Sequence, residues 1–240
     1  MSIAEKSIII AENVPKVYQA GYEKGKADGG GGENIFYYAQ TFQGIFQAIY
    51  FPENYNAVVK VKKAPNNMNY MFERAYNLKS IKFISEERNT ANAAAQLTAG
   101  IQMTSTNLAT LETVDFTEFN QDFTYLHSTF YGQAKLHSIF GALDVTRCNE
   151  FSNFVKFCYE LKNIEFVPNT IFFNISFADS QKLSAESIQS IFDGLATVET
   201  ARTLTLNANL KILQSQVDSA NAKGWTIAGG TVVSEEEYYG

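Results

Sequence analysis

The chain of 240 residues has few of the residue types that usually carry chemistry: two cysteines, two histidines, one tryptophan and four prolines. Cys148 and Cys158 are too few and wrongly spaced for a zinc site or a disulfide framework, so both are expected to be buried thiols. Basic residues are also scarce. Because the chain has 19 basic and 25 acidic residues, and therefore a net charge of −6, we expect no nucleic-acid partner.

Long hydrophobic runs are missing as well. The longest aliphatic run, Ile8 to Ile10, is far shorter than the ~20 residues of a membrane span, and no signal-peptide pattern opens the chain. The sequence therefore predicts a soluble protein made in the cytoplasm, with no membrane insertion. Aromatic residues are in contrast abundant, with 19 Phe and 13 Tyr.

The first 27 residues are predicted to form a helical segment. Apolar or small residues recur there at alternating spacings of four and three, typical of a coiled-coil seam, and Ile at these positions favours three strands. Pro15 offers the alternative of two short helices. The residues expected to mediate attachment or trimerisation are Ile3, Ile10, Val14 and Val17. Four consecutive glycines, residues 29–32, predict a flexible linker over residues 28–33.

A short pattern of the form Leu-x-x-Ile-x-Phe recurs in the next part of the chain. Its five copies begin 32, 33, 25 and 25 residues apart, at Phe46, Leu78, Leu111, Leu136 and Leu161. Residues 75–83 read AYNLKSIKF and residues 158–166 read CYELKNIEF. Each copy predicts a short strand, and no single copy could bury its apolar side without neighbours, so the pattern predicts a solenoid.

Bulky apolar residues upstream of these strands, such as Phe72, Phe130 and Phe154, are expected to fill the opposite turn. With this feature the chain resembles the leucine-rich repeats of the BspA type, over about residues 36–210. Residues 10–22, IAENVPKVYQAGY, followed by a glycine-rich linker, are similar to the opening of such proteins encoded by phages and prophages of gut bacteria. The resemblance implies an α/β fold: an irregular leucine-rich-repeat solenoid over residues 34–175.

The C-terminal part predicts a helix-strand-helix-strand cap over residues 176–230. Ser184 is expected to cap a helix that buries Ile188 and Leu195, and a strand follows at 203–206. A second helix is predicted with Leu210 and Leu213 on its apolar face, ending before Gly224. Residues 225–227 should return as a strand. The acidic tail, residues 231–240, is expected to be mobile or to extend toward a partner.

Catalytic and metal sites find little support in the sequence. His127 and His137 lie within the repeat pattern, and His137 occupies the position that Lys79 and Lys162 hold in other copies, so it is expected to face solvent. We therefore expect no catalytic residue, cofactor or metal. A glycan-cleaving enzyme would need a pair of carboxylates in a cleft, and the acidic pairs here occur in polar runs.

The aromatic surplus is the remaining functional indication. Many aromatic residues crowd residues 36–55, where they could close the end of the stack or contact a sugar or protein. The candidate ligand contacts are Tyr37, Tyr38, Tyr50 and Tyr55. The resemblance implies a non-enzymatic virion protein that attaches through its N-terminal helix and contacts the host surface or other virion proteins. A bacterial cell-surface adhesin is the alternative.

Overall fold

The computed structural model describes residues 43, 46–48, 50–64, 66–90, 96–98, 100–120 and 122–239. The predicted N-terminal helix and glycine linker lie outside these residues. So do six of the residues singled out from the sequence: Ile3, Ile10, Val14, Val17, Tyr37 and Tyr38.

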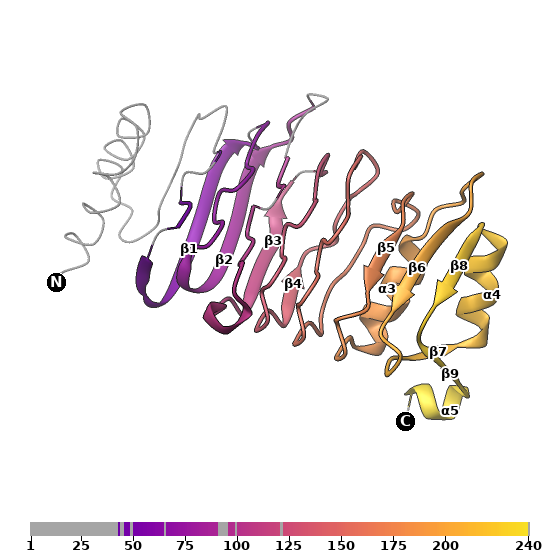
Figure 1. Ribbon diagram of the computed structural model, residues 1–240. Coiled ribbons are helices and arrows are strands. Elements are labelled where there is room, and N and C mark those ends of the chain that lie inside the picture. The colour runs from indigo at the N-terminus through magenta and orange to yellow at the C-terminus, as the bar shows by residue number, and fades with distance from the viewer. Residues whose placement is uncertain are drawn as a thin grey trace.

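Parallel strands dominate the described chain and make the fold α/β, as predicted (Figure 1). Four of them form one sheet in the order of the sequence: β1 (Tyr50–Lys63), β2 (Tyr76–Glu87), β3 (Thr113–Phe119) and β4 (Ser138–Phe140). Between β2 and β3 lies a short 3-10 helix, η1 (Thr106–Leu108). Each strand is joined to the next by a turn-rich crossover, which parallel pairing requires.

The C-terminal part contains two more parallel sheets. One has the order β5 (Ile175–Phe177), β6 (Arg202–Leu206) and β8 (Trp225–Ala228), and the other pairs β7 (Lys211–Leu213) with β9 (Thr231–Val233). Three helices accompany them: α3 (Ala185–Gly194), α4 (Gln214–Ala222) and α5 (Glu235–Tyr239). In Figure 1 the strands from β1 to β8 succeed one another along one direction, with the helices near the C-terminal end.

The strand register confirms most of the recurring sequence pattern. Ile81 pairs with Val114, Val114 pairs with Ile139, and the residues before Ile139 and Ile164 form an isolated bridge. The four apolar side chains therefore stack on one another, and each is at most 1% exposed. Copies two to five of the pattern hold equivalent positions.

The first copy, assigned to residues 46–51, is wrong. The amide of Phe46 donates to the carbonyl of Met71, which places Phe46 beside the turn before β2. The residues that pair with the pattern in β2 are instead Tyr55, Ala57 and Val59. A β-bulge shifts the register at Tyr55, and it breaks the regular spacing on which the sequence assignment depended.

The turns opposite the strands repeat the same backbone conformation. Pairs of left-handed residues four apart occur at Tyr70 and Arg74, at Ser128 and Gly132, and at residues 153 and 157. Amides in the first two segments donate to carbonyls 28 and 24 residues further on, as Tyr70 does to Thr98 and Ser128 does to Ser152, and the amide of Phe157 donates to the side-chain carboxylate of Asp179. The crossovers are therefore held in register by backbone hydrogen bonds as the strands are.

One continuous core of buried side chains runs through the described residues. The upstream apolar residues fill the turns as predicted: Met71, Phe72, Phe130 and Phe154 are at most 2% exposed. Phe72 stacks on Phe46 with ring centroids 5.0 Å apart, and Phe130 meets Phe154 at 5.2 Å. Each buried ring of this size stabilises the fold by roughly 1.5–3 kcal/mol.

Helix α3 follows the prediction closely, whereas α4 begins later than expected. The hydroxyl of Ser184 accepts a hydrogen bond from the amide of Ser187 at 3.2 Å and so caps α3. Leu210 and Leu213 are buried, but from a bend and from β7, so the second helix starts only at Gln214. The buried residues of β7 and of α4 face the same core, and together they are spaced as the apolar face of one helix would be. Gly224 ends α4 with φ +91°, as its predicted role requires.

Of the two alternatives for the acidic tail, mobility is wrong for residues 231–239, and its extension toward a partner stays a prediction. Residues 231–233 form β9, and α5 follows after Ser234, whose hydroxyl accepts from the amide of Glu237. The ring of Tyr238 is 9% exposed, and its hydroxyl donates to the carbonyl of Ala185 at 3.0 Å. The side-chain amide of Gln216 in turn donates to that hydroxyl. These contacts dock the tail on α3 and α4.

Candidate functional site

Two predicted ligand contacts, Tyr50 and Tyr55, lie in the described residues at the start of β1. The ring of Tyr50 is 74% exposed. Tyr55 is half-buried because its ring stacks on Phe51 at 4.9 Å and packs against the core. Of the two, Tyr50 presents the larger surface to a ligand.

The half-buried Tyr76 stacks on the exposed Tyr50, and this contact was not predicted. Tyr50 and Tyr76 are register partners at the first positions of β1 and β2, and their ring centroids lie 4.3 Å apart with an interplanar angle of 19°. The sequence held a signal for this contact, because Tyr76 belongs to the AYNLKSIKF segment. With the first repeat assigned to residues 46–51, Tyr50 and Tyr76 do not fall at equivalent positions, so the sequence pattern does not predict their contact.

Polar side chains lie three residues before each of these tyrosines. The side-chain amide of Gln47 donates to the carboxylate of Glu73, which is also 3.7 Å from Nε of Arg74. Amide, carboxylate and guanidinium together supply both donors and acceptors at this corner of the sheet.

A second aromatic cluster lies further along the same corner. Tyr131 meets Phe157 edge to face at 5.2 Å, Phe157 lies 6.2 Å from Tyr159, and the ammonium group of Lys156 is 5.2 Å from the centroid of Phe157. Tyr159 is 38% exposed. Like Tyr76, it follows a left-handed residue by two positions, here Phe157 in place of Arg74.

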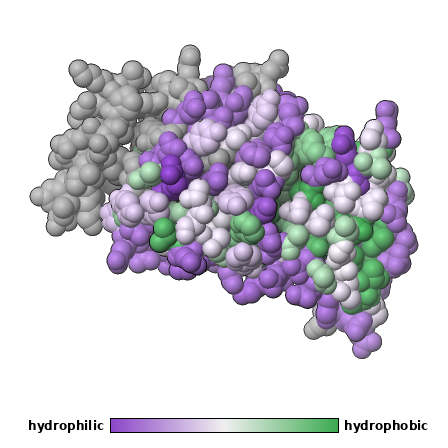
Figure 2. Space-filling model, in the orientation of Figure 1, coloured by the Kyte–Doolittle hydropathy of each residue, from purple (hydrophilic) through white to green (hydrophobic). Residues whose placement is uncertain are grey.

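Polar side chains form rows across the strands of the larger sheet, and they range from the exposed Asn56 to the buried Ser138. One row comprises the register partners Asn56, Ser80, Thr113, Ser138 and Asn163. Within it Ser80 donates to Asn56 at 2.6 Å, and Asn163 donates to Ser138 at 2.9 Å. Figure 2 shows hydrophilic residues over much of the described face, with hydrophobic patches toward the C-terminal strands.

His137 faces solvent directly before β4, as predicted. Backbone hydrogen bonds place it in a row with Lys79, Glu112 and Lys162, and its side chain is 46% exposed. The carboxylate of Glu112 lies 3.8 Å from the ammonium group of Lys79 and 4.0 Å from Nε2 of His137. At this exposure such pairs contribute at most about 1 kcal/mol.

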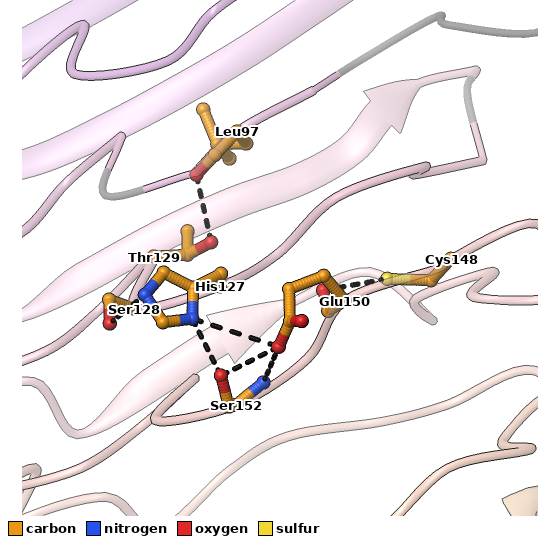
Figure 3. A network of polar contacts seen from close by, with 7 residues as sticks. All are labelled: Leu97, His127, Ser128, Thr129, Cys148, Glu150 and Ser152. Carbon is orange, nitrogen blue, oxygen red and sulfur yellow. Dashed lines mark hydrogen bonds and ion pairs between the residues drawn. The ribbon is translucent and has the colours of Figure 1, made fainter.

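His127 lies among hydroxyls and a carboxylate in the turns (Figure 3). Its Nδ1 is 2.6 Å from Oγ of Ser152 and 3.7 Å from the carboxylate of Glu150, and its Nε2 is 3.2 Å from Oγ of Ser128. The Ser152 hydroxyl donates to Glu150 at 2.6 Å. Hydrogen bonds from Ser152 and the charge of His127 lower the pKa of the Glu150 carboxyl.

This network resembles a triad in composition but joins two turns of the fold. In a serine triad the carboxylate and the nucleophile bind opposite ring nitrogens, and free amides stabilise the oxyanion. Ser152 shares Nδ1 with the carboxylate and donates its proton to that carboxylate. The hydroxyl of Ser128 lies near Nε2, where a nucleophile would be. However, the amide of Ser128 donates to the carbonyl of Ser152 and that of Thr129 donates to the carbonyl of Leu126, so neither amide is free to stabilise an oxyanion. The contacts hold residues 126–128 against residues 150–152.

A buried carboxylate joins three consecutive segments. Asp122 has a 2% exposed side chain, with Nη2 of Arg88 at 3.0 Å and Nε of Arg147 hydrogen-bonded to its other oxygen. Arg88 also lies 3.6 Å from Asp144. Burial raises the pKa of the Asp122 carboxyl, but Arg147 and Arg88 outweigh burial, and the net pKa is below the ordinary value.

The two cysteines are buried free thiols, as expected. Desolvation raises the pKa of Cys148 to about 12, and it raises that of Cys158 further. Among the described residues, no group of three or more His, Cys, Asp or Glu side chains could hold a metal ion. Within the same part of the chain, no helix is long and apolar enough to cross a membrane.

No family model, curated protein or solved structure matches this chain.

Proposed function

We propose that the chain is an irregular leucine-rich-repeat solenoid over residues 34–175 with a capping unit over residues 176–230. Three features support this architecture: four pattern copies in register, left-handed residues that recur in pairs four apart, and one core that continues between segments. A stack of this kind buries a continuous core because each segment covers the apolar side of its neighbour.

The solenoid serves, on this proposal, as a non-enzymatic virion structural or adhesion protein. The observations that carry the proposal are the row of register-aligned polar side chains at Asn56, Ser80, Thr113 and Asn163, and the exposed Tyr50 at the start of β1. Such a row offers many fixed contacts to one extended partner. The groups around His127 are engaged in holding two turns together, which supports a structural role for this Ser–His–Glu grouping.

The N-terminal segment attaches the protein to the particle and trimerises it through Ile3, Ile10, Val14 and Val17. Several copies on one particle convert weak contacts into strong overall attachment. The partners are then other copies of the chain, neighbouring virion proteins and a glycan or protein of the host surface. The protein is displayed on the virion surface and becomes extracellular after lysis.

Mass spectrometry of purified particles tests the proposed location. Particles made from the genome that carries this gene should contain the protein in a fixed ratio to the major capsid protein. Envelope fractions of the same host without particle production serve as the control. Detection in the envelope and not in particles would overturn the virion proposal in favour of the cell-surface adhesin.

Light scattering of the full-length chain tests the trimer. The chain should have three times the monomer mass, and Ile10→Asp should reduce it to the monomer because a carboxylate is costly in an apolar seam. Glu12→Gln, outside the seam, is the matched control and should remain a trimer. A monomeric parent chain would contradict trimerisation through this segment.

A further inference from the structure

Two groups of mutually contacting aromatic side chains in the described residues each contain one exposed tyrosine, Tyr50 in the first and Tyr159 in the second. Tyr50 and Tyr76 form one group, and Tyr131, Phe157 and Tyr159 form another. Backbone hydrogen bonds run from Arg74 to Gln102, from Met103 to Tyr131 and from Gly132 to Lys156. These bonds align residues 74, 103, 132 and 157, so both groups lie along one edge of the stack.

We propose that this edge is a binding track for a glycan chain, which rests on the proposed adhesion function and names its ligand class. A pyranose ring has a flat C–H face and a rim of hydroxyls. The C–H face suits the electron-rich face of a tyrosine ring, and the rim requires hydrogen-bond partners. Tyr50 has one face against Tyr76 and is still 74% exposed, so its remaining surface is open to such a ring.

The polar groups beside the tyrosine stack suit the hydroxyl rim. The Gln47 amide and the Glu73 carboxylate are already hydrogen-bonded to each other, so their positions are fixed before a ligand arrives. The carboxylate can accept hydrogen bonds from ligand hydroxyls, and the neighbouring amide can donate a hydrogen bond to an adjacent hydroxyl. Because the rings and these polar groups are preorganised, binding would cost little side-chain entropy.

Because a second aromatic group lies along the same edge, we expect the ligand to be a chain of sugars rather than a single sugar. Residues 74 and 157 are separated by three steps of the stack, which corresponds to ~14 Å at the usual strand spacing. Tyr159 and Phe157 therefore form a second contact, beyond the reach of one sugar ring bound to Tyr50. A protein ligand is the competing occupant, and it would not depend on matched sugar contacts at both groups.

Calorimetric titration of the full-length chain with defined oligosaccharides tests the track. The probes are cellohexaose, mannohexaose and chitohexaose, each beside its disaccharide. At least one hexasaccharide should bind, and more tightly than its disaccharide. Tyr50→Ala should weaken that binding by about tenfold through loss of ring contact. Tyr50→Phe, which keeps the ring, should stay within about threefold of the parent chain.

Tyr159→Ala should weaken hexasaccharide binding and leave disaccharide binding unchanged. Tyr239→Ala is the matched control, because Tyr239 is 72% exposed on α5, outside both groups, and it should bind as the parent chain does. No binding of any hexasaccharide at millimolar concentration, or undiminished binding by Tyr50→Ala, would overturn the track. If the protein is present in particles and binds no hexasaccharide, the track alone fails. If it binds hexasaccharides and is absent from particles, the virion proposal fails.

Discussion

Replacing Gly132 by alanine should destabilise the protein more than any surface substitution in the turns. Gly132 has φ +77°, and a Cβ on it would lie 1.8 Å from the carbonyl oxygen of Met103. That oxygen belongs to backbone, and both turns are fixed, because Met103 donates to Tyr131 and Gly132 donates to Lys156. The methyl group can therefore be accommodated only if two hydrogen-bonded segments move apart.

The size of the effect follows from two costs. The left-handed conformation costs an alanine about 1–2 kcal/mol. The forced separation of packed segments adds about 1–3 kcal/mol, so the free energy of unfolding should fall by about 2–5 kcal/mol. Urea unfolding followed by far-UV circular dichroism measures this difference.

Asn153→Ala is the matched control because Asn153 is exposed and already carries a side chain at φ +54°. That substitution should cost about 1 kcal/mol, which is the conformational cost without the clash. If Gly132→Ala lowers the free energy of unfolding no more than Asn153→Ala does, the contact with Met103 does not constrain the fold as reasoned.

Three further predictions concern the α3 cap, the buried carboxylate and the thiols. Ser184→Ala should lower the free energy of unfolding by about 1 kcal/mol in urea titration, whereas an unchanged value would mean that the cap is dispensable. Asp122 is kept ionised by Arg147 and a second arginine, so its folded pKa is below its unfolded value. Its contribution to stability is therefore present above the unfolded pKa of about 4 and is lost as pH falls through the folded value. Asp122→Asn should be less stable at pH 7 and lose less stability on acidification, and parallel pH profiles for the two proteins would refute this. Cys148 and Cys158 should react with a thiol reagent at pH 8 only after denaturation, because burial keeps both protonated; rapid labelling of the native protein would contradict their buried positions.

Local sequence signals predicted the elements that depend on local interactions. Ser184 before an amphipathic segment located α3, and Gly224 marked the end of α4. The repeated Leu-x-x-Ile-x-Phe spacing placed Ile81, Val114 and Ile139 on one face of the sheet, as the register confirms. In each case the residue type and its spacing are dictated by one helix turn or one strand.

Features that depend on pairing between distant segments could not be predicted from local sequence patterns. The bulge at Tyr55 shifts the first repeat out of the spacing that the other copies share, and the spacing of Leu213 fits a helix as well as the strand β7. Tyr238 docks the tail through contacts with residues far away in sequence, which no local pattern encodes. The sequence predicts Tyr50 as a ligand contact, but only the strand register shows that Tyr76 stacks on it.

Hydrogen bonds and ion pairs between neighbouring segments affect both the stability of the stack and its proposed binding of a glycan. In a stack each segment contacts mainly its neighbours, so the distance between two remote side chains is the sum of the steps between them. Gly132 lies in one of the segments between Tyr76 and Tyr159, and Asp122 and His127 hold that region to the next segment. Gly132→Ala should accordingly weaken hexasaccharide binding while disaccharide binding at Tyr50 persists under conditions where the variant is folded. Equal loss of both affinities would show that the two aromatic groups are not independent contacts on one rigid track.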